Sequence, residues 1–341
     1  MSPRIRLKRL WLPLWLATLL TAAGSANALE ISPVDSVEIS TSPVWLNPDD
    51  PKQERVGRLV WRGGLEIMSR DSRVGGFSGL VVSPDGRRLL AVSDKGYWLS
   101  ARLRYDGGQR LSGLDEGSVA RMRGLDGETL SKKKWRDAES LAALDDGSYL
   151  VSFERKHRFW RYSLSHGLAN ALPTAWPKPE GLKGLRKNRG VEALVALRDG
   201  GILALAQDRV DKSDSQGFLW HEKRWSRLTY HRPEGFGPSG ATRLPGGDVL
   251  VLERKKLRSS GFIVRLVRLS SSDLGRGANL RGHELARLEA PLTVENFEGV
   301  AARKGPGGET LIYLLSDDDL TKHRRTLLVM FELVGSKEGH Y

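Results

Sequence analysis

The chain has 341 residues, of which 39% are hydrophobic and 28% charged, a composition typical of globular proteins with a large buried core. Its 54 lysines and arginines outnumber 41 acids, which gives a formal net charge of +13. The absence of cysteine excludes disulfides, thiolate metal sites and cysteine nucleophiles. No nucleic-acid-binding motif occurs, so no nucleic-acid partner is expected.

The first 28 residues predict a secretory signal peptide. Four basic residues precede an apolar run at 10–23, and the Ala-Asn-Ala sequence at 26–28 fits a small-x-small cleavage site. The run is too short for a spanning helix, and an uncleaved anchor is the alternative. Cleavage leaves 54 − 4 = 50 basic residues against 41 acids, a net charge of +9. We therefore expect a periplasmic or secreted protein, without stable membrane insertion, that tolerates or attracts anionic ligands.

Five similar segments follow, each with a leading Ser or Glu, an apolar strand, a Gly turn, a second apolar strand and a polar end. Their leading residues are separated by 61, 53, 47 and 59 residues, a period that suits one four-stranded sheet per repeat. Segments between the repeats read as further strands, rich in β-branched and aromatic residues. The repeats cover residues 77–94, 138–155, 191–208, 238–254 and 297–318.

This pattern predicts an all-β fold, a β-propeller of about five blades, because radial stacking buries both faces of small sheets and protects their edges. Six blades is the alternative, if 97–135 or the N-terminal stretch forms an extra sheet, and a pair of β-sandwiches is a further one. The last repeat lacks a fourth strand, which 57–69 could supply beside 325–333 to close the ring. We assign an N-terminal extension to 29–56, the propeller to 57–335 and a tail to 336–341.

In a propeller, equivalent positions of the inner strands converge on a central channel. Converging carboxylates oppose one another's ionisation, so they pair with cations or bind metal. Arg155 and Arg254 are candidate partners, and Ca²⁺ is the metal that suits carboxylate oxygens. The aspartates at 317–319 are the strongest candidate ligands. One ring comprises the leading residues Ser78, Glu139, Glu192, Ser239 and Glu298, and a second comprises the motif ends around Asp94, Glu154, Asp208, Glu253 and Asp317.

Other catalytic signatures are missing from the sequence. It contains no H-E-x-x-H, G-x-S-x-G or P-loop motif. The motifs that are present, "GGFSGL", "DAESL", "SFER", "LVLER" and "NFEGVA", together resemble the exported phytase-like family, described as having esterase-like activity of phytase. The resemblance covers about 59–333 and implies a propeller, export and hydrolysis of phosphoesters in phosphorylated small molecules.

Residue roles follow from that resemblance combined with the repeat positions. The histidine-phosphatase signature R-H-G-x-R-x-P is absent, so phytase-like chemistry here implies a metal, for which we expect Ca²⁺. Gln207 departs from the pattern, since an acid is expected there. The alternative is a non-catalytic envelope propeller that binds an anionic ligand, a glycan or a protein. The expected roles are catalysis for Glu139, Glu192 and Glu298, phosphate binding for Arg155 and Arg254, and metal binding for Asp94, Glu154, Glu253, Asp317 and Asp318.

Overall fold

The computed structural model describes residues 34–209, 211, 213–258, 261–321 and 323–335. The described residues all belong to one compact unit, Ser32–Tyr341. The predicted signal peptide, its cleavage site and the tail at 336–341 lie outside the described residues. Within the described ranges, no helix combines the length and apolar character needed to cross a membrane.

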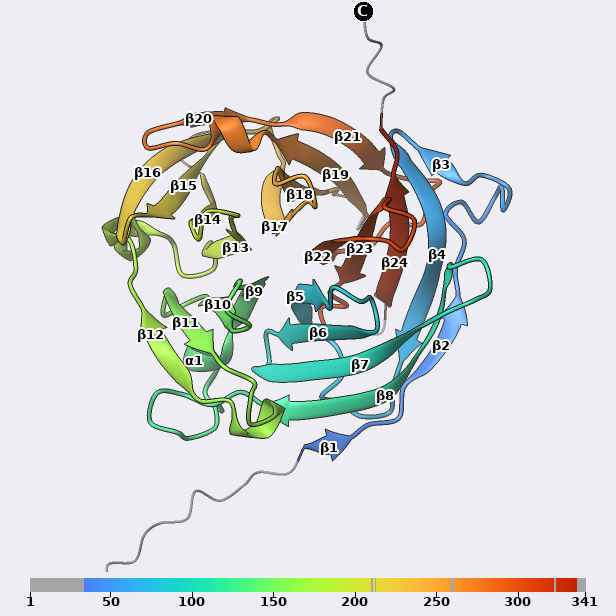
Figure 1. Cartoon of the computed structure of the whole chain (residues 1–341), viewed down its shortest axis with the longest axis horizontal. Coiled ribbons are helices and arrows are strands. Elements are labelled where there is room, and N and C mark those ends of the chain that lie inside the picture. The colour runs from blue at the N-terminus through green and yellow to red at the C-terminus, as the bar shows by residue number, and fades with distance from the viewer. Residues whose placement is uncertain (1–33, 210, 212, 259–260, 322, 336–341) are drawn as a thin grey trace, which may run out of the picture. The chain divides into compact units, whose positions relative to one another are not determined.

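The Ser32–Tyr341 unit consists of five blades of antiparallel strands (Figure 1). The first contains β5 (Phe77–Val82), β6 (Arg88–Ser93), β7 (Tyr97–Tyr105) and β8 (Leu111–Arg121), edged by β1 (Asp35–Ser36). The second contains β9 (Ala138–Ala143), β10 (Tyr149–Phe153), β11 (Arg158–Tyr162) and β12 (Pro173–Trp176). The third contains β13 (Val191–Ala196), β14 (Ile202–Arg209), β15 (Asp214–His221) and β16 (Arg224–His231), edged by β20 (Asn279–Arg281).

The fourth blade contains β17 (Gly237–Arg243), β18 (Val249–Lys256), β19 (Phe262–Leu269) and β21 (His283–Leu288). The fifth contains β22 (Phe297–Lys304), β23 (Thr310–Ser316), β24 (Thr326–Leu333) and β4 (Leu59–Met68), edged by β2 (Ser40–Pro43) and β3 (Arg55–Val56). Helical structure is restricted to single turns: α1 (Lys133–Arg136) and the 3₁₀ segments Leu168–Asn170, Glu180–Gly184 and Ser271–Asp273.

The two innermost strands of each blade form a hairpin whose turn contains a glycine. The glycine has a positive φ in all five hairpins, a conformation that side chains with a Cβ rarely adopt. The innermost strands contact one another in sequence around the ring, β5 with β9, β9 with β13, and onward to β22 and back to β5. The turn glycines are Gly86, Gly147, Gly200, Gly247 and Gly308.

Ring closure by the two ends of the domain is confirmed. β4 pairs antiparallel with β24 from Leu59↔Leu333 to Ile67↔Thr326, so an N-terminal strand completes the last blade (Figure 1). The six-blade alternative is wrong. Residues 97–135 supply β7, β8 and α1, and the N-terminal stretch supplies strands at the edges of the first and fifth blades.

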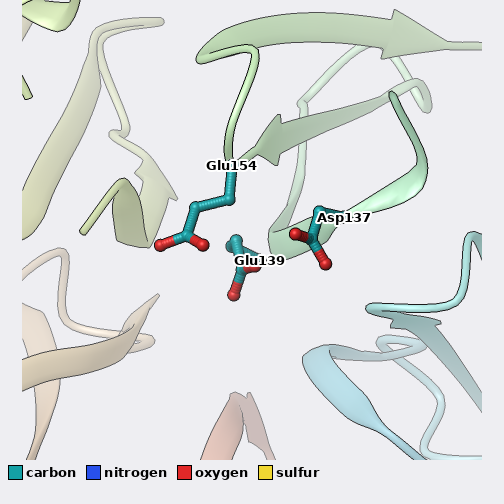
Figure 2. Close-up of side chains that lie close together, drawn as sticks. All are labelled: Asp137, Glu139 and Glu154. Atoms are coloured by element: carbon teal, nitrogen blue, oxygen red, sulfur yellow. The ribbon is translucent and has the colours of Figure 1, made fainter. Parts of the chain in front are cut away.

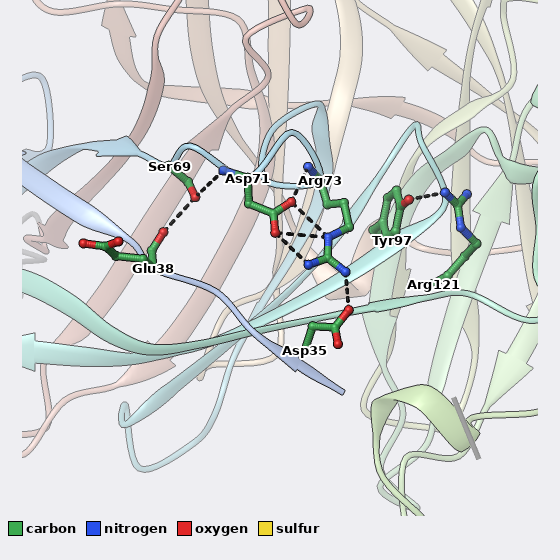
Figure 3. A network of polar contacts seen from close by, with 7 residues as sticks. All are labelled: Asp35, Glu38, Ser69, Asp71, Arg73, Tyr97 and Arg121. Atoms are coloured by element: carbon green, nitrogen blue, oxygen red, sulfur yellow. Dashed lines mark hydrogen bonds and ion pairs between the residues drawn. The ribbon is translucent and has the colours of Figure 1, made fainter. Parts of the chain in front are cut away.

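A network of ion pairs fastens the N-terminal segment to the first blade (Figure 3). Arg73 donates to both carboxylate oxygens of Asp71, at 2.9 Å from Nε and 2.7 Å from Nη2, and its Nη1 contacts Asp35 of β1. The Ser69 hydroxyl donates to the Glu38 carbonyl at 2.7 Å. These contacts hold the N-terminal segment in place before the first repeat begins.

Loss of the Asp71 charge should weaken the fold in a defined pH range. The hydrogen bonds from Arg73 lower the pKa of Asp71 to about 2, below its usual value of about 3.9. This stabilisation is therefore complete above about pH 4 and lost as the pH falls towards 2. We expect Asp71→Asn to cost about 1 kcal/mol at pH 7, since a partly exposed pair is screened by solvent. The free energies of unfolding of the parent protein and the variant, measured in urea, should converge near pH 2. An equal difference between them at pH 7 and at pH 2 would contradict this assignment of the pKa shift.

Candidate functional site

The five leading residues share a structural position, a β-bulge on the innermost strand. In every blade the strand pairing skips this residue; in the second blade, for example, Ala138 pairs with Phe153 and Ser140 with Ser152, which leaves Glu139 unpaired in the ladder. A bulge redirects the side chain relative to its neighbours. The skipped residues are Ser78, Glu139, Glu192, Ser239 and Glu298.

Three carboxylates of the second blade form the tightest acidic group in the described part of the chain. Asp137, Glu139 and Glu154 each offer an oxygen, and these oxygens all lie within 4.8 Å of one another (Figure 2). Asp137 and Glu154 are buried, and Glu139 is half-buried. The Gly190 amide donates to Glu154 Oε1 at 3.0 Å, which orients this carboxylate between the second and third blades. We call these three residues the acidic cluster.

The protonation of this region is strongly perturbed by burial. Desolvation, followed by the neighbouring acids Glu192 and Glu154, raises the pKa of Glu139 well above its ordinary value. Desolvation and Asp137 raise the pKa of Glu154 to about 7, against the lowering effect of the Gly190 amide. Burial therefore favours the protonated forms of Glu139 and Glu154 near neutral pH.

Glu192 and Glu298 are electrostatically coupled to each other and to the acidic cluster. Desolvation, and then the charge of Glu298, raises the pKa of Glu192 well above its usual range. Glu298 accepts from Arg254 Nη1 at 2.8 Å, in a pair whose side chains are 17% and 9% exposed. The three glutamates predicted from the leading ring are thus coupled, and one of them is already paired with an arginine.

Asn296 connects Glu298 to the end of the last repeat. Its Nδ2 donates to Glu298 Oε1 at 3.1 Å and to Asp317 Oδ2 at 3.2 Å. The Asn296 side chain is 1% exposed, yet its Oδ1 has no hydrogen-bond partner. Desolvation, followed by the charge of Glu298, raises the pKa of Asp317 to about 10. A buried oxygen without a partner calls for an explanation in a native fold, and a bound water or ion is one.

Asp94 and Asp318 both hydrogen-bond to the backbone of Gly76, Asp94 through its amide and Asp318 through its carboxylate. Asp318 Oδ1 accepts from the amides of Gly76 and Leu320, both at 3.0 Å, and Oδ2 accepts from Thr326 at 3.1 Å. Asp318 thus holds a loop in place. Asp94 differs, because its buried Oδ1 has no hydrogen-bond partner. Burial, and then the charge of Asp137, raises the pKa of Asp94.

Glu253 is not brought to the acidic cluster, which corrects its assignment as a metal ligand. It is 1% exposed and accepts from Arg265 Nη1 at 2.5 Å and from the Tyr230 hydroxyl at 2.6 Å. The strand register explains the error: Glu253 pairs with Pro238 just as Phe153 pairs with Ala138. It is therefore equivalent to Phe153, and a shift of one residue along a strand reverses the face. Arg254 is the true equivalent of Glu154.

Both predicted phosphate-binding arginines already contact acids of the site. Arg155 forms an ion pair with Asp137 through Nε, as Arg254 does with Glu298 through Nη1. Each guanidinium has further donors. At the Gln207 position, the neighbouring Asp208 pairs with Arg186, with Nε to Oδ1 at 2.8 Å.

Two residues of the site, Asp137 and Asn296, were missed by the sequence analysis. Both stand two positions before a leading glutamate, where the other three blades have glycines: Gly76, Gly190 and Gly237. Alignment of the five repeats at this position, two residues before the leading residue, could have identified both. At Gly76 the glycine is required, since its φ is +69° and an added Cβ would lie 2.5 Å from Asp94 Oδ1.

Comparison with known proteins identifies one family. The profile of the Phytase-like family, described as "Esterase-like activity of phytase", matches residues 72–320. No curated protein matches the sequence.

Several solved propellers are similar at low identity. A luciferin-regenerating enzyme is 12% identical, with a TM-score of 0.39 and coverage of 78% of this chain and 94% of the other. A regucalcin from Agrobacterium tumefaciens, described as a calcium-binding protein, is 11% identical, with a TM-score of 0.41 and coverage of 77% and 93%. A gluconolactonase from Xanthomonas campestris is 12% identical, with a TM-score of 0.38 and coverage of 88% and 98%. At these scores, the similarity assigns no activity to this chain.

Proposed function

Because the chain belongs to the Phytase-like family, we propose that it is an exported, calcium-dependent hydrolase of phosphoesters in small phosphorylated molecules. The observation that carries the proposal is the acidic cluster, in which oxygens of Asp137, Glu139 and Glu154 lie within 4.8 Å of one another. Export rests on the sequence features at 1–28, and phosphate specificity on the family description and the two arginines.

The donor set fits Ca²⁺. Carboxylate and amide oxygens are the ligands that this ion takes, and the cluster supplies carboxylates from Asp137, Glu139 and Glu154. The unpartnered oxygens of Asn296 and Asp94 point to the same need for a cation. We assign Glu139 to metal binding, along with Asp94 and Asp317. When bound, Ca²⁺ would neutralise phosphate charge and lower the pKa of a coordinated water.

The remaining residues can position the ester and move protons. Arg155 and Arg254 would bind phosphate oxygens through guanidinium nitrogens that Asp137 and Glu298 leave free. Water adds to phosphorus while the bond to the ester oxygen breaks. Glu192, whose pKa is raised by burial, would give its proton to that leaving oxygen, and Glu298 would accept the proton of the water.

Two matched substitutions should separate metal binding from proton transfer. Calcium at a hundredfold excess over its Kd should stabilise the purified protein by about 2.7 kcal/mol, visible as a higher Tm. Glu154→Gln should abolish both this rise and hydrolysis. Glu192→Gln should lower kcat by about 100-fold or more while the calcium-dependent rise persists. Glu284→Gln, on β21 of the fourth blade, is the control and should change neither.

The measurements are thermal unfolding with and without chelator, and phosphate release from p-nitrophenyl phosphate and phytate. A rise in Tm without any hydrolysis would favour the non-catalytic alternative, a propeller that binds an anionic ligand. The pairs Arg155–Asp137 and Arg254–Glu298 provide the specific reason to consider it, because they compensate part of the acidic charge internally. If calcium neither raises the Tm nor supports hydrolysis, the metal site itself is rejected.

A further inference from the structure

A large cavity lies where the central channel meets the hairpin turns, away from the acidic cluster. Its volume is about 820 Å³, within the range of small-molecule sites. None of the residues assigned above to catalysis, phosphate binding or metal binding lines it. Apolar side chains two positions after each leading residue form part of its wall: Leu80, Leu141, Leu194, Ala241 and Val300.

One blade departs from the apolar character of this wall. Four positions after the leading residue, the other blades have Val82, Ala143, Ala196 and Ala302, but the fourth blade has Arg243. At the preceding position the fourth blade likewise has a polar residue, where the others have valine or alanine. A charged side chain next to the apolar positions of the inner strands is typical of a site that orients a ligand.

The polar residue next to Arg243 is Thr242, which also lines the cavity. Arg243 forms an ion pair with Asp145, Nη2 to Oδ1 at 2.7 Å, which links the fourth blade to the β9–β10 turn of the second. Both side chains are partly exposed, at 30% and 57%. Such a pair is weak, so a ligand anion can replace Asp145.

The charge around the cavity is strongly asymmetric. Among the described residues that line it, Asp145 is the one acid against five basic residues. Arg198 at the mouth donates to the Pro245 carbonyl at 2.7 Å, and Lys304 is exposed there. The basic lining residues are Arg88, Arg198, Arg243, Arg303 and Lys304. Arg88 is paired with Glu116 outside the lining, and the remaining excess of positive charge favours an anion at the mouth.

We propose that this cavity is a second binding site, for a small amphipathic anion with an apolar body and one carboxylate, sulfate or sulfonate head group. The apolar body occupies the channel between the inner strands. The head group binds Arg243 in place of Asp145, with the Thr242 hydroxyl as a second donor. The site is independent of the proposed hydrolase activity, because it shares no residue with the acidic cluster.

The proposal can be tested with 8-anilinonaphthalene-1-sulfonate, whose fluorescence reports apolar binding, on the full chain in the presence of chelator. Arg243→Ala should weaken binding at least about tenfold, as expected for the loss of a charged hydrogen bond. Asp145→Asn should tighten it about two- to fivefold, because Arg243 loses its competitor. Ala143→Phe, at an exposed wall position, should block binding. Arg224→Ala, an exposed arginine outside the cavity lining, is the control.

Competition identifies the ligand class. Decanoate should displace the dye, while decanol, with the same chain length and no charge, should displace it at least about tenfold less well. Near-UV circular dichroism establishes that each variant is folded. Unchanged binding by Arg243→Ala, or equal competition by decanol, would overturn the proposal; so would dye binding that survives Ala143→Phe.

Discussion

A chain shortened to begin at Asp71 is expected to lose its folded structure. The truncation removes β4, which supplies the outer strand of the fifth blade through its pairing with β24. Four large side chains of β4 are buried: Leu59, Trp61, Leu65 and Ile67. Each contributes about 1.5–3 kcal/mol, so their loss is comparable with the total stability of about 5–15 kcal/mol of an ordinary domain.

The matched control is a chain that begins at Val34 and keeps every described strand. Circular dichroism and urea unfolding should show a cooperative transition for this control and none for the chain that begins at Asp71. A soluble, cooperatively folding chain from Asp71 onward would mean that β4 is dispensable and that the ring does not depend on closure by the N-terminal strand.

Substitution of Glu253 is expected to cost stability and to leave calcium binding intact. Glu253→Gln preserves size but removes the charge that faces Arg265, whose side chain is 9% exposed. The substitution leaves Arg265 with the partly exposed Glu284 as its remaining acidic partner among the described residues, and the loss of a buried hydrogen bond to a charged group costs about 1.5–3 kcal/mol. The loss should appear as a lower urea midpoint and Tm, with the calcium-dependent rise in Tm of the parent protein retained.

Glu284→Gln is the matched control for this experiment. Glu284 also pairs with Arg265, but its side chain is 33% exposed, so its removal should cost about 1 kcal/mol or less. If Glu253→Gln were as stable as the parent and had lost the calcium effect, Glu253 would have to be restored to the metal site.

The blade count and the ring closure could be predicted from the sequence, because they depend on local patterns. Each hairpin carries its own alternating apolar residues and a turn glycine such as Gly86 or Gly147. The shortage of a strand in the last repeat indicated that 57–69 completes it. The shared position of Glu139, Glu192 and Glu298 could also be predicted, because each leads its repeat and precedes the same apolar pattern.

Which acids meet could not be read from the repeats in the same way. Glu253 and Glu154 stand in similar motifs, "LVLER" and "SFER", but the strand register places them one position apart. Because side chains alternate between the two faces of a strand, that difference turns Glu253 towards Arg265 of its own blade and Tyr230 of the third blade.

By itself, the sequence determined the all-β class, five repeated hairpins, the strand that closes the ring and the three glutamates at the head of the inner strands. The tertiary structure decided that Asp137 joins Glu139 and Glu154, that Asn296 links Glu298 to Asp317, and that Arg243 faces an apolar cavity. The physical reason is that hydrophobic alternation is a property of neighbouring residues, whereas burial, pairing and pKa depend on side chains that only the closed ring brings together.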